Sequence, residues 1–174
     1  AQIEATASGS TVTFNGSSAQ TIPAGAFYND KVYNLTVNNS NNVTLNGTVR
    51  LLNNLTASSG LLDATTTGAT MVYEGTSEQA IASSQYVNNR AYNVTVNNTA
   101  GVVLNTNFTV LNDAAINSGD KLTIPENIGL TVNGALTNNA GNAGLLLKSS
   151  ASGTASLIHN SYGVAATVQR YISG

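Results

Sequence analysis

The sequence predicts an all-β protein, a right-handed parallel β-helix or β-solenoid with coils of about 20 residues. Three observations support this fold class: a long internal repeat, short strands of alternating hydrophobicity, and a lack of helical periodicity. Residues 11–63 align with residues 70–122 without a gap, and 19 of the 53 aligned pairs are identical. A gapless repeat of this length is typical of stacked architectures, in which each copy rests on its neighbour.

The composition excludes several classes of function. Charged residues make up 8% of the chain, against roughly 25% in an average soluble domain. The net charge is −2 and the six basic residues are scattered, so we expect no nucleic-acid partner. The absence of cysteine excludes a disulfide framework and thiolate chemistry. No apolar run approaches ~18–20 residues, so we expect no membrane insertion.

The first copy of the repeat begins with short strands separated by turns. Residues 1–10 are small and polar and are interpreted as a lead-in. Residues 11–14 alternate and end at an Asn-Gly turn, and residues 19–22 form a second strand that stops at a proline. The loop 24–32 contains Lys31, which aligns with Arg90 as the only aligned basic pair.

The strongest strand signal is the stretch at residues 34–38, which returns 59 positions later. Leu35 and Val37 take one face of this strand and Thr36 takes the other. Similar short strands are expected at residues 43–45, 48–51, 55–57 and 60–63, and at their counterparts in the second copy. Asparagines between the strands are suited to corners, where their side chains can bond to the backbone.

A shorter spacing within the repeat predicts the length of one coil. Leu35 and Leu55 are 20 positions apart, and the same spacing recurs later in the chain. Three turns of about 20 residues would then make one 59-residue repeat. The predicted solenoid covers residues 11–137, with copies at 11–69 and 70–128. The runner-up fold is an antiparallel β-sandwich.

The C-terminal segment departs from the repeat after residue 122. Residues 138–174 are expected to form a divergent cap, either as terminal coils or as capping strands, because a solenoid exposes a strand edge at each end. The strand pattern that precedes Gly174 suggests either that the chain is cut from a longer protein or that a further domain follows.

Several motifs resemble the surface and secreted proteins of bacteria that use the type IX secretion system. The motifs are Tyr-Asn-Leu-Thr-Val-Asn-Asn at 33–39, Leu-Thr-Ile-Pro at 122–125, Leu-Thr-Val-Asn-Gly at 130–134, Leu-Thr-Asn-Asn-Ala-Gly at 136–141, Gly-Thr-Ala-Ser-Leu-Ile-His-Asn at 153–160 and Ala-Thr-Val-Gln-Arg-Tyr-Ile at 166–172. The resemblance covers most of the chain from about residue 11. It implies an extracellular or cell-surface location, and one β-helical module of a longer exported protein.

The residues that could carry catalysis are sparse. His159 is the only histidine, and its neighbours are typical of a strand and a turn. The acids of the second copy, among them Glu74 and Asp113, are scattered singly and have no acidic counterparts in the first. Paired carboxylates are required for general acid/base cleavage of a polysaccharide. We therefore expect no enzyme activity, no catalytic residues, no metal and no cofactor, although a polysaccharide-binding or -cleaving β-helix remains an alternative.

Two sets of outward residues are candidates for binding. Tyr33 and Tyr92 occupy equivalent positions, where they could form an aromatic sugar platform or simply cover the flank of the solenoid. A set of threonines should point away from the core; these are Thr36, Thr44, Thr48, Thr56, Thr95, Thr109, Thr123 and Thr131. Regularly spaced threonines on a flat face could order water, which makes an ice-binding protein a second alternative.

The sequence therefore favours a non-catalytic structural or adhesive module of an exported bacterial surface protein. Its expected partners are other copies of itself, stacked end to end into an extracellular fibre, or a surface glycan. Thr44 and Thr56 are replaced by Val103 and Ala115 in the second copy, which weakens the ice-binding alternative.

Overall fold

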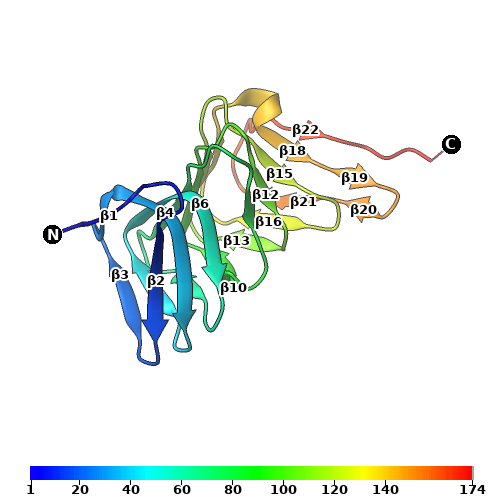
Figure 1. Cartoon of the computed structure of the whole chain (residues 1–174). Coiled ribbons are helices and arrows are strands. Elements are labelled where there is room, and N and C mark those ends of the chain that lie inside the picture. Colours follow the sequence, from blue (N-terminus) through cyan, green and yellow to red (C-terminus); the bar gives the residue numbers. More distant parts are fainter. Residues whose placement is uncertain (174) are drawn as a thin grey trace.

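The chain folds as a parallel β-solenoid of about 7 turns, with coils of about 22 residues (Figure 1). The structure is a computed structural model and describes residues 1–173. The predicted β-solenoid class is confirmed, and the two termini lie at opposite ends of the stack (Figure 1). All pairings between coils are parallel in the described residues, so the alternative of an antiparallel sandwich is wrong.

Each coil contributes strands to three faces. The first face contains β1 (Ile3–Ala5), the first part of β4 (Phe27–Asn39), the first part of β6 (Thr48–Ala57), β8 (Thr70–Tyr73), β11 (Asn93–Val96), β14 (Ala114–Ile116) and β17 (Leu136–Asn138). The second face contains β2 (Thr11–Gly16), the second parts of β4 and β6, β9 (Gln79–Ile81), β12 (Val102–Leu104), β15 (Leu122–Ile124), β18 (Leu145–Leu147) and β22 (Thr167–Val168). The third face contains β3 (Gln20–Pro23), β5 (Val43–Asn46), β7 (Leu62–Ala64), β10 (Tyr86–Ala91), β13 (Phe108–Val110), β16 (Gly129–Val132) and β21 (Ser156–Ile158).

Strands β4 and β6 are long because each runs through a corner and serves two faces. Residues 27–32 of β4 pair with β1, and residues 34–39 pair with β2. The pairing of β4 with β6 shifts register between Val32 and Asn34, which marks the corner. The first part of β6 pairs onward with β8 on the first face.

The 59-residue repeat does not correspond to three turns, which corrects the expectation from the sequence. With coils of about 22 residues, one repeat spans eight strand segments before β8 begins: β2, β3, both parts of β4, β5, both parts of β6, and β7. Eight segments at three per turn leave the second copy rotated by one face. Leu35 therefore stacks between Val12 and Leu55 on the second face, whereas its equivalent Val94 stacks between Met71 and Ala114 on the first.

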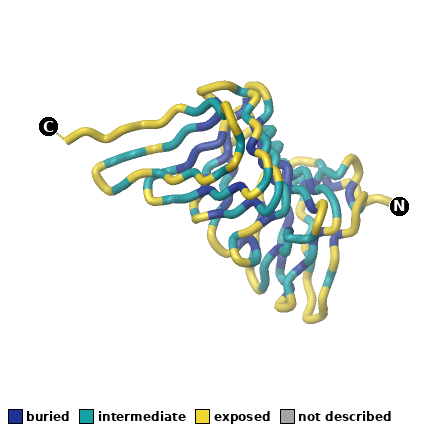
Figure 2. The backbone as a smooth tube through the Cα atoms, turned by 180° about the vertical axis from the view of Figure 1, so that it is seen from behind, coloured by how far each residue is buried: buried dark blue, intermediate teal, exposed yellow. Residues whose placement is uncertain are grey.

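The core is a set of aliphatic columns that run along the stack. Alternate residues of each strand point inward, so Leu35, Val37, Val43 and Leu45 are all 0% exposed. Figure 2 shows the buried segments distributed along the whole stack, with the exposed segments concentrated at the turns and the two ends. One coil alone cannot bury such a face, and the columns are continuous only because successive coils pair in register.

Asparagine side chains hold the corners, as the sequence suggested. Buried Asn39 donates from Nδ2 to the carbonyl of Ser18 and to Oε1 of Gln20, both at 2.7 Å, and its Oδ1 accepts from the backbone of Asn41. The equivalent Asn98 repeats these contacts one face away. Each amide links two neighbouring coils and leaves no unpaired polar atom in the corner.

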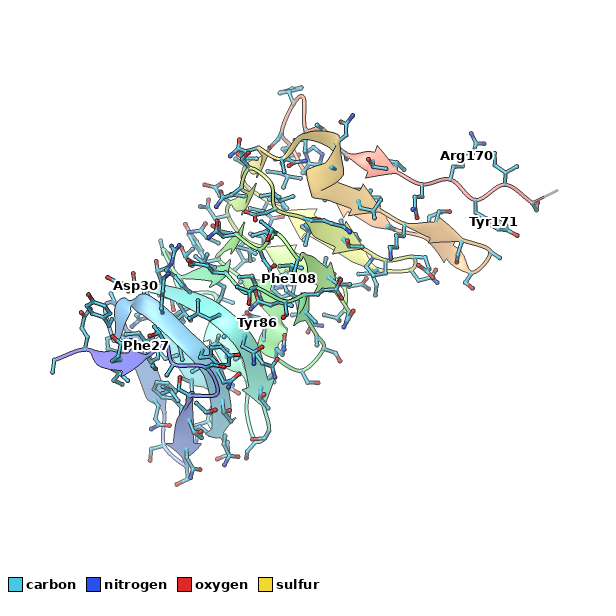
Figure 3. All side chains as sticks on the ribbon, turned by 45° about the horizontal axis from the view of Figure 1, so that its top comes forward. Phe27, Asp30, Tyr86, Phe108, Arg170 and Tyr171 are labelled. Atoms are coloured by element: carbon cyan, nitrogen blue, oxygen red, sulfur yellow. The ribbon has the colours of Figure 1, made fainter. Side chains whose placement is uncertain are left out.

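The core also holds one polar pair, which is surrounded by aromatic packing. The hydroxyl oxygens of Tyr73 and Tyr86 are 2.6 Å apart, and both side chains are almost completely buried. The ring of Phe108 packs edge-on against Tyr86, with ring centroids 5.3 Å apart (Figure 3). Burial raises the pKa of both tyrosines, so they remain neutral and keep the hydrogen bond.

The terminal segments extend the stack. The expected lead-in contains β1, which pairs with β4 in the first coil. At the other end β18, β21 and β22 continue the second and third faces, although they are shorter than the strands expected there. A hairpin of β19 (Ser149–Ser150) and β20 (Gly153–Thr154) projects from the last complete coil (Figure 1). The 3-10 turn η1 (Gly141–Gly144) is the one helical element of the described residues.

The coil length can be tested by disulfide formation, because the chain contains no cysteine. Ala80 pairs with Val103, 23 positions later, on adjacent strands, and adjacent strands are within the distance that a disulfide needs. The variant Ala80→Cys/Val103→Cys should therefore form an intramolecular disulfide on mild oxidation, detected by mass spectrometry. Ala80→Cys/Ala100→Cys, which a 20-residue coil would bring together, should stay reduced; the reverse result would contradict the register.

The tyrosine pair can be tested with a double-mutant cycle. Tyr86→Phe should lower the free energy of unfolding by roughly 1–3 kcal/mol, because the buried hydroxyl of Tyr73 loses its partner. Tyr73→Phe/Tyr86→Phe should cost less than the sum of the two single variants, measured by urea unfolding. Strictly additive costs would show that the two hydroxyls do not stabilise each other.

Candidate functional site

The candidate threonines are divided among all three faces. Thr36 and Thr56 lie on the second face, Thr48 and Thr95 on the first, and Thr44, Thr109 and Thr131 on the third. These seven are at least partly exposed. The members in the first copy already lie on all three faces, because Thr36, Thr44 and Thr48 come from successive strand segments of the coil. No single face therefore carries the whole set.

Thr123 is not available at the surface, which corrects the expectation that it faces solvent. It lies at an outward position of β15, where it pairs with Val103 on one side and Leu146 on the other. Only 4% of its surface is exposed. Outward aliphatic side chains on the adjacent strands crowd the position, so the hydroxyl is covered.

The two candidate tyrosines are on different corners and form no common platform. Tyr33 lies within β4 at the corner between the first and second faces, and its hydroxyl accepts a hydrogen bond from Ser8 at 3.3 Å. Tyr92 lies between β10 and β11, at the corner between the third and first faces, and packs against the core. Each covers the flank of its own repeat.

The structure places a shallow groove of about 560 Å³ on the third face, over β10, β13, β16 and β21. Its floor is one row of paired outward residues on successive coils: Arg90, Thr109, Thr131 and Ile158. Because paired residues on parallel strands stack along the solenoid, the groove runs along the axis. Buried Phe108 is among the lining residues, and its ring packs against Tyr86 in the core.

Several of the residues that line the groove are asparagines in left-handed conformations. Asn88 and Asn89 both have φ of 53° and form a bulge in β10, and Asn127 has φ of 62° before β16. Asparagine tolerates this conformation better than most residues. Oδ1 of Asn107 accepts a hydrogen bond from the backbone of Gly129 at 2.7 Å, and Asn127 donates to the carbonyl of Ser152. These bonds hold the side chains of Asn107 and Asn127, both in the groove lining, in place.

The first face carries a cluster of charges at the position equivalent to the groove. Oε1 of Glu74 lies 3.0 Å from Nζ of Lys31, and Oε2 lies 2.5 Å from Nε of Arg50. Burial alone would raise the pKa of Glu74, but its ion pairs with Arg50 and Lys31 outweigh this effect and hold that pKa below the ordinary value of 4.5. Lys31 aligns with Arg90 in the repeat. Lys31 is neutralised by Glu74 from the following coil, whereas Arg90 stays in the groove without an acidic residue in the lining.

The sequence contained one signal for this groove. That signal is the alignment of Arg90 with Lys31, the only aligned basic pair. The alignment does not show that the two residues have different neighbours, because those neighbours depend on the face that each copy occupies. The other lining residues are ordinary Asn, Thr and Ser, which are abundant throughout the chain. Sequence reasoning therefore did not distinguish them.

The other titratable groups are dispersed. Within residues 1–173 no three His, Asp or Glu side chains come together in a way that could hold a metal ion. Nδ1 of His159 accepts a hydrogen bond from the backbone of Ser161 and takes part in a turn. Burial raises the pKa of Asp120, which sits in the turn before β15. No helix of the described chain is long and apolar enough to span a membrane.

Comparisons of the chain with protein-family models, with curated proteins and with solved structures find no match. The interpretation of this site therefore rests on its geometry.

The ion-pair cluster predicts a dependence of stability on pH. Glu74→Gln should lower the free energy of unfolding at pH 7 by about 1 kcal/mol, because it leaves two half-buried cations without their partner. The folded pKa of Glu74 is below the ordinary value, so its contribution is complete above pH 4.5 and is lost as pH falls through the folded pKa. The difference between wild type and variant should therefore disappear in acid.

Urea unfolding at pH 7 and in acid measures this difference. Glu78→Gln removes an exposed glutamate that makes no ion pair within the described residues, and it provides the matched control. An equal loss of stability in both variants would contradict a specific role for the cluster.

Proposed function

We propose that this chain is a non-catalytic structural and adhesive module of an exported bacterial surface protein, and that copies associate end to end. The observation that supports association most directly is the location of the exposed apolar side chains. Among the described residues, the large hydrophobic side chains that are exposed belong to the first two coils or to the last two; these are Ile3, Tyr28, Ile158, Tyr162, Val168, Tyr171 and Ile172.

Both ends also present strands that pair on one side only. In the described chain β2 and β3 pair only with the coil that follows them, and β21 and β22 pair only with the coil that precedes them. Unpaired edges of this kind are templates for another strand. The last coil adds an extended tail with Arg170 and Tyr171, which projects away from the body of the solenoid (Figure 3).

The surface of the middle coils is consistent with the proposed role as a non-catalytic scaffold. Its surface is mostly uncharged Asn, Thr and Ser, and the groove on the third face is lined by no carboxylate. A general acid and a general base would be required there for glycoside cleavage. An extended, weakly charged surface suits a module that holds other parts of an exported protein away from the cell.

End-to-end association can be tested by measuring the molar mass of the protein in solution at increasing protein concentration. Light scattering should show oligomers at high concentration, and electron microscopy should show filaments with the width of one solenoid. The variant Val168→Lys/Ile172→Lys places two charges on the exposed last coil and should keep the protein monomeric, because buried unpaired charges are costly.

Asn105→Lys/Asn133→Lys adds the same charge at exposed positions between the two ends and serves as the control. Control protein that assembles like wild type would support association through the ends. Wild-type protein that stays monomeric at every concentration, without filaments, would overturn the proposal of assembly.

A further inference from the structure

We infer that the groove on the third face binds an extended oligosaccharide that carries carboxylate groups, with Arg90 as the residue that recognises the charge. This inference rests on the proposed adhesive function and identifies the surface and ligand class through which adhesion would occur.

The shape of the groove fits a linear chain of sugar units. Its floor residues come from four successive strands of the third face, and adjacent strands are about 4.8 Å apart. The floor is therefore roughly 14 Å long by the same spacing and offers one side chain per coil. A repeating polar surface with this spacing presents similar contacts to successive sugar units of an extended polymer.

The polar groups of the groove are available to a ligand. Within residues 1–173 the side chains of Arg90, Thr109, Thr131 and Ser156 form no hydrogen bond with the protein, and neither do those of Asn88 and Asn89. Hydroxyls and amides can both donate and accept, which suits the hydroxyl groups of a sugar. Ile158 is 61% exposed at the end of the floor and offers an apolar surface to a ring face.

The charge of the groove favours an acidic sugar over a neutral one. Arg90 is the one charged residue among the lining side chains, and the lining contains no Asp or Glu. The neighbouring strand carries Asp63, but Oδ1 of Asp63 accepts from the backbone and the hydroxyl of Thr65 at 3.1 and 2.6 Å. A guanidinium group without an acidic partner is suited to bidentate recognition of a carboxylate.

The equivalent region of the first face provides an internal comparison. There Lys31 and Arg50 are both engaged by Glu74. On the third face the positions aligned with Lys31 and Arg50 are Arg90 and Thr109. Asn133 directly follows β16 on this face, as Glu74 directly follows β8 on the first. The two copies thus share a backbone arrangement, but only the second leaves its cation free for a ligand.

The experiment is a calorimetric titration of the full chain with a short oligogalacturonate, with a cello-oligosaccharide of equal length as the neutral probe. Oligogalacturonate should bind, and its affinity should fall as salt is raised. Arg90→Gln should weaken this binding about tenfold or more, because a charge-assisted contact is lost. Thr131→Val should weaken it as well, while both variants should unfold at the same temperature as wild type.

Lys121→Gln is the matched control, since Lys121 is exposed and lies outside the groove lining; it should bind like wild type. Absence of oligogalacturonate binding, or equal binding by wild type and Arg90→Gln, would overturn the inference. Equal affinity for the neutral probe would overturn the preference for carboxylates. The mass of each variant at high concentration is measured in parallel, so that a failure of glycan binding is distinguished from a failure of end-to-end assembly.

Discussion

Register between successive coils is the constraint on which the rest of this structure depends. Each coil presents a narrow apolar face that it cannot bury alone, and the backbone of its strands needs partners above and below. Parallel pairing in register satisfies both needs at once, because it places inward side chains such as Leu35 and Leu55 directly over one another. The same pairing aligns outward side chains into rows, so the surface pattern is a by-product of the core.

Asparagine makes the repeated corners possible without charge. The amides of Asn39 and Asn98 satisfy backbone groups in two adjacent coils while being almost completely buried. Others link corners side by side, as when Asn53 donates to Asn34 and Asn112 donates to Asn93 in the second copy. An uncharged side chain that both donates and accepts can be buried here at lower cost than an ion.

The rotation of the second repeat by one face explains how two similar segments acquire different surfaces. Lys31 and Arg90 are equivalent in sequence, but Lys31 lies beside Arg50 and Glu74 on the first face. Arg90 lies in a row with Thr109 and Thr131 on the third face. Because the neighbours of a residue in a solenoid are set by the coils before and after it, equivalent residues need not have equivalent chemistry. The proposed glycan groove follows from this difference.

The sequence alone determined the β-solenoid class, the inward positions such as Leu35 and Val37, and the role of asparagine at corners. These features depend on alternation and turn chemistry, which are local and therefore readable along the chain. Tertiary structure decided the coil of about 22 residues and the face on which each copy lies. The first physical reason is that β4 and β6 remain extended through a corner, so the alternation of hydrophobic residues does not reveal the bend. The second is that a small change in coil length moves every later residue around the solenoid axis, toward another face. The groove at Arg90 and the burial of Thr123 depend on that rotation and on neighbours about one coil away, which no local pattern specifies.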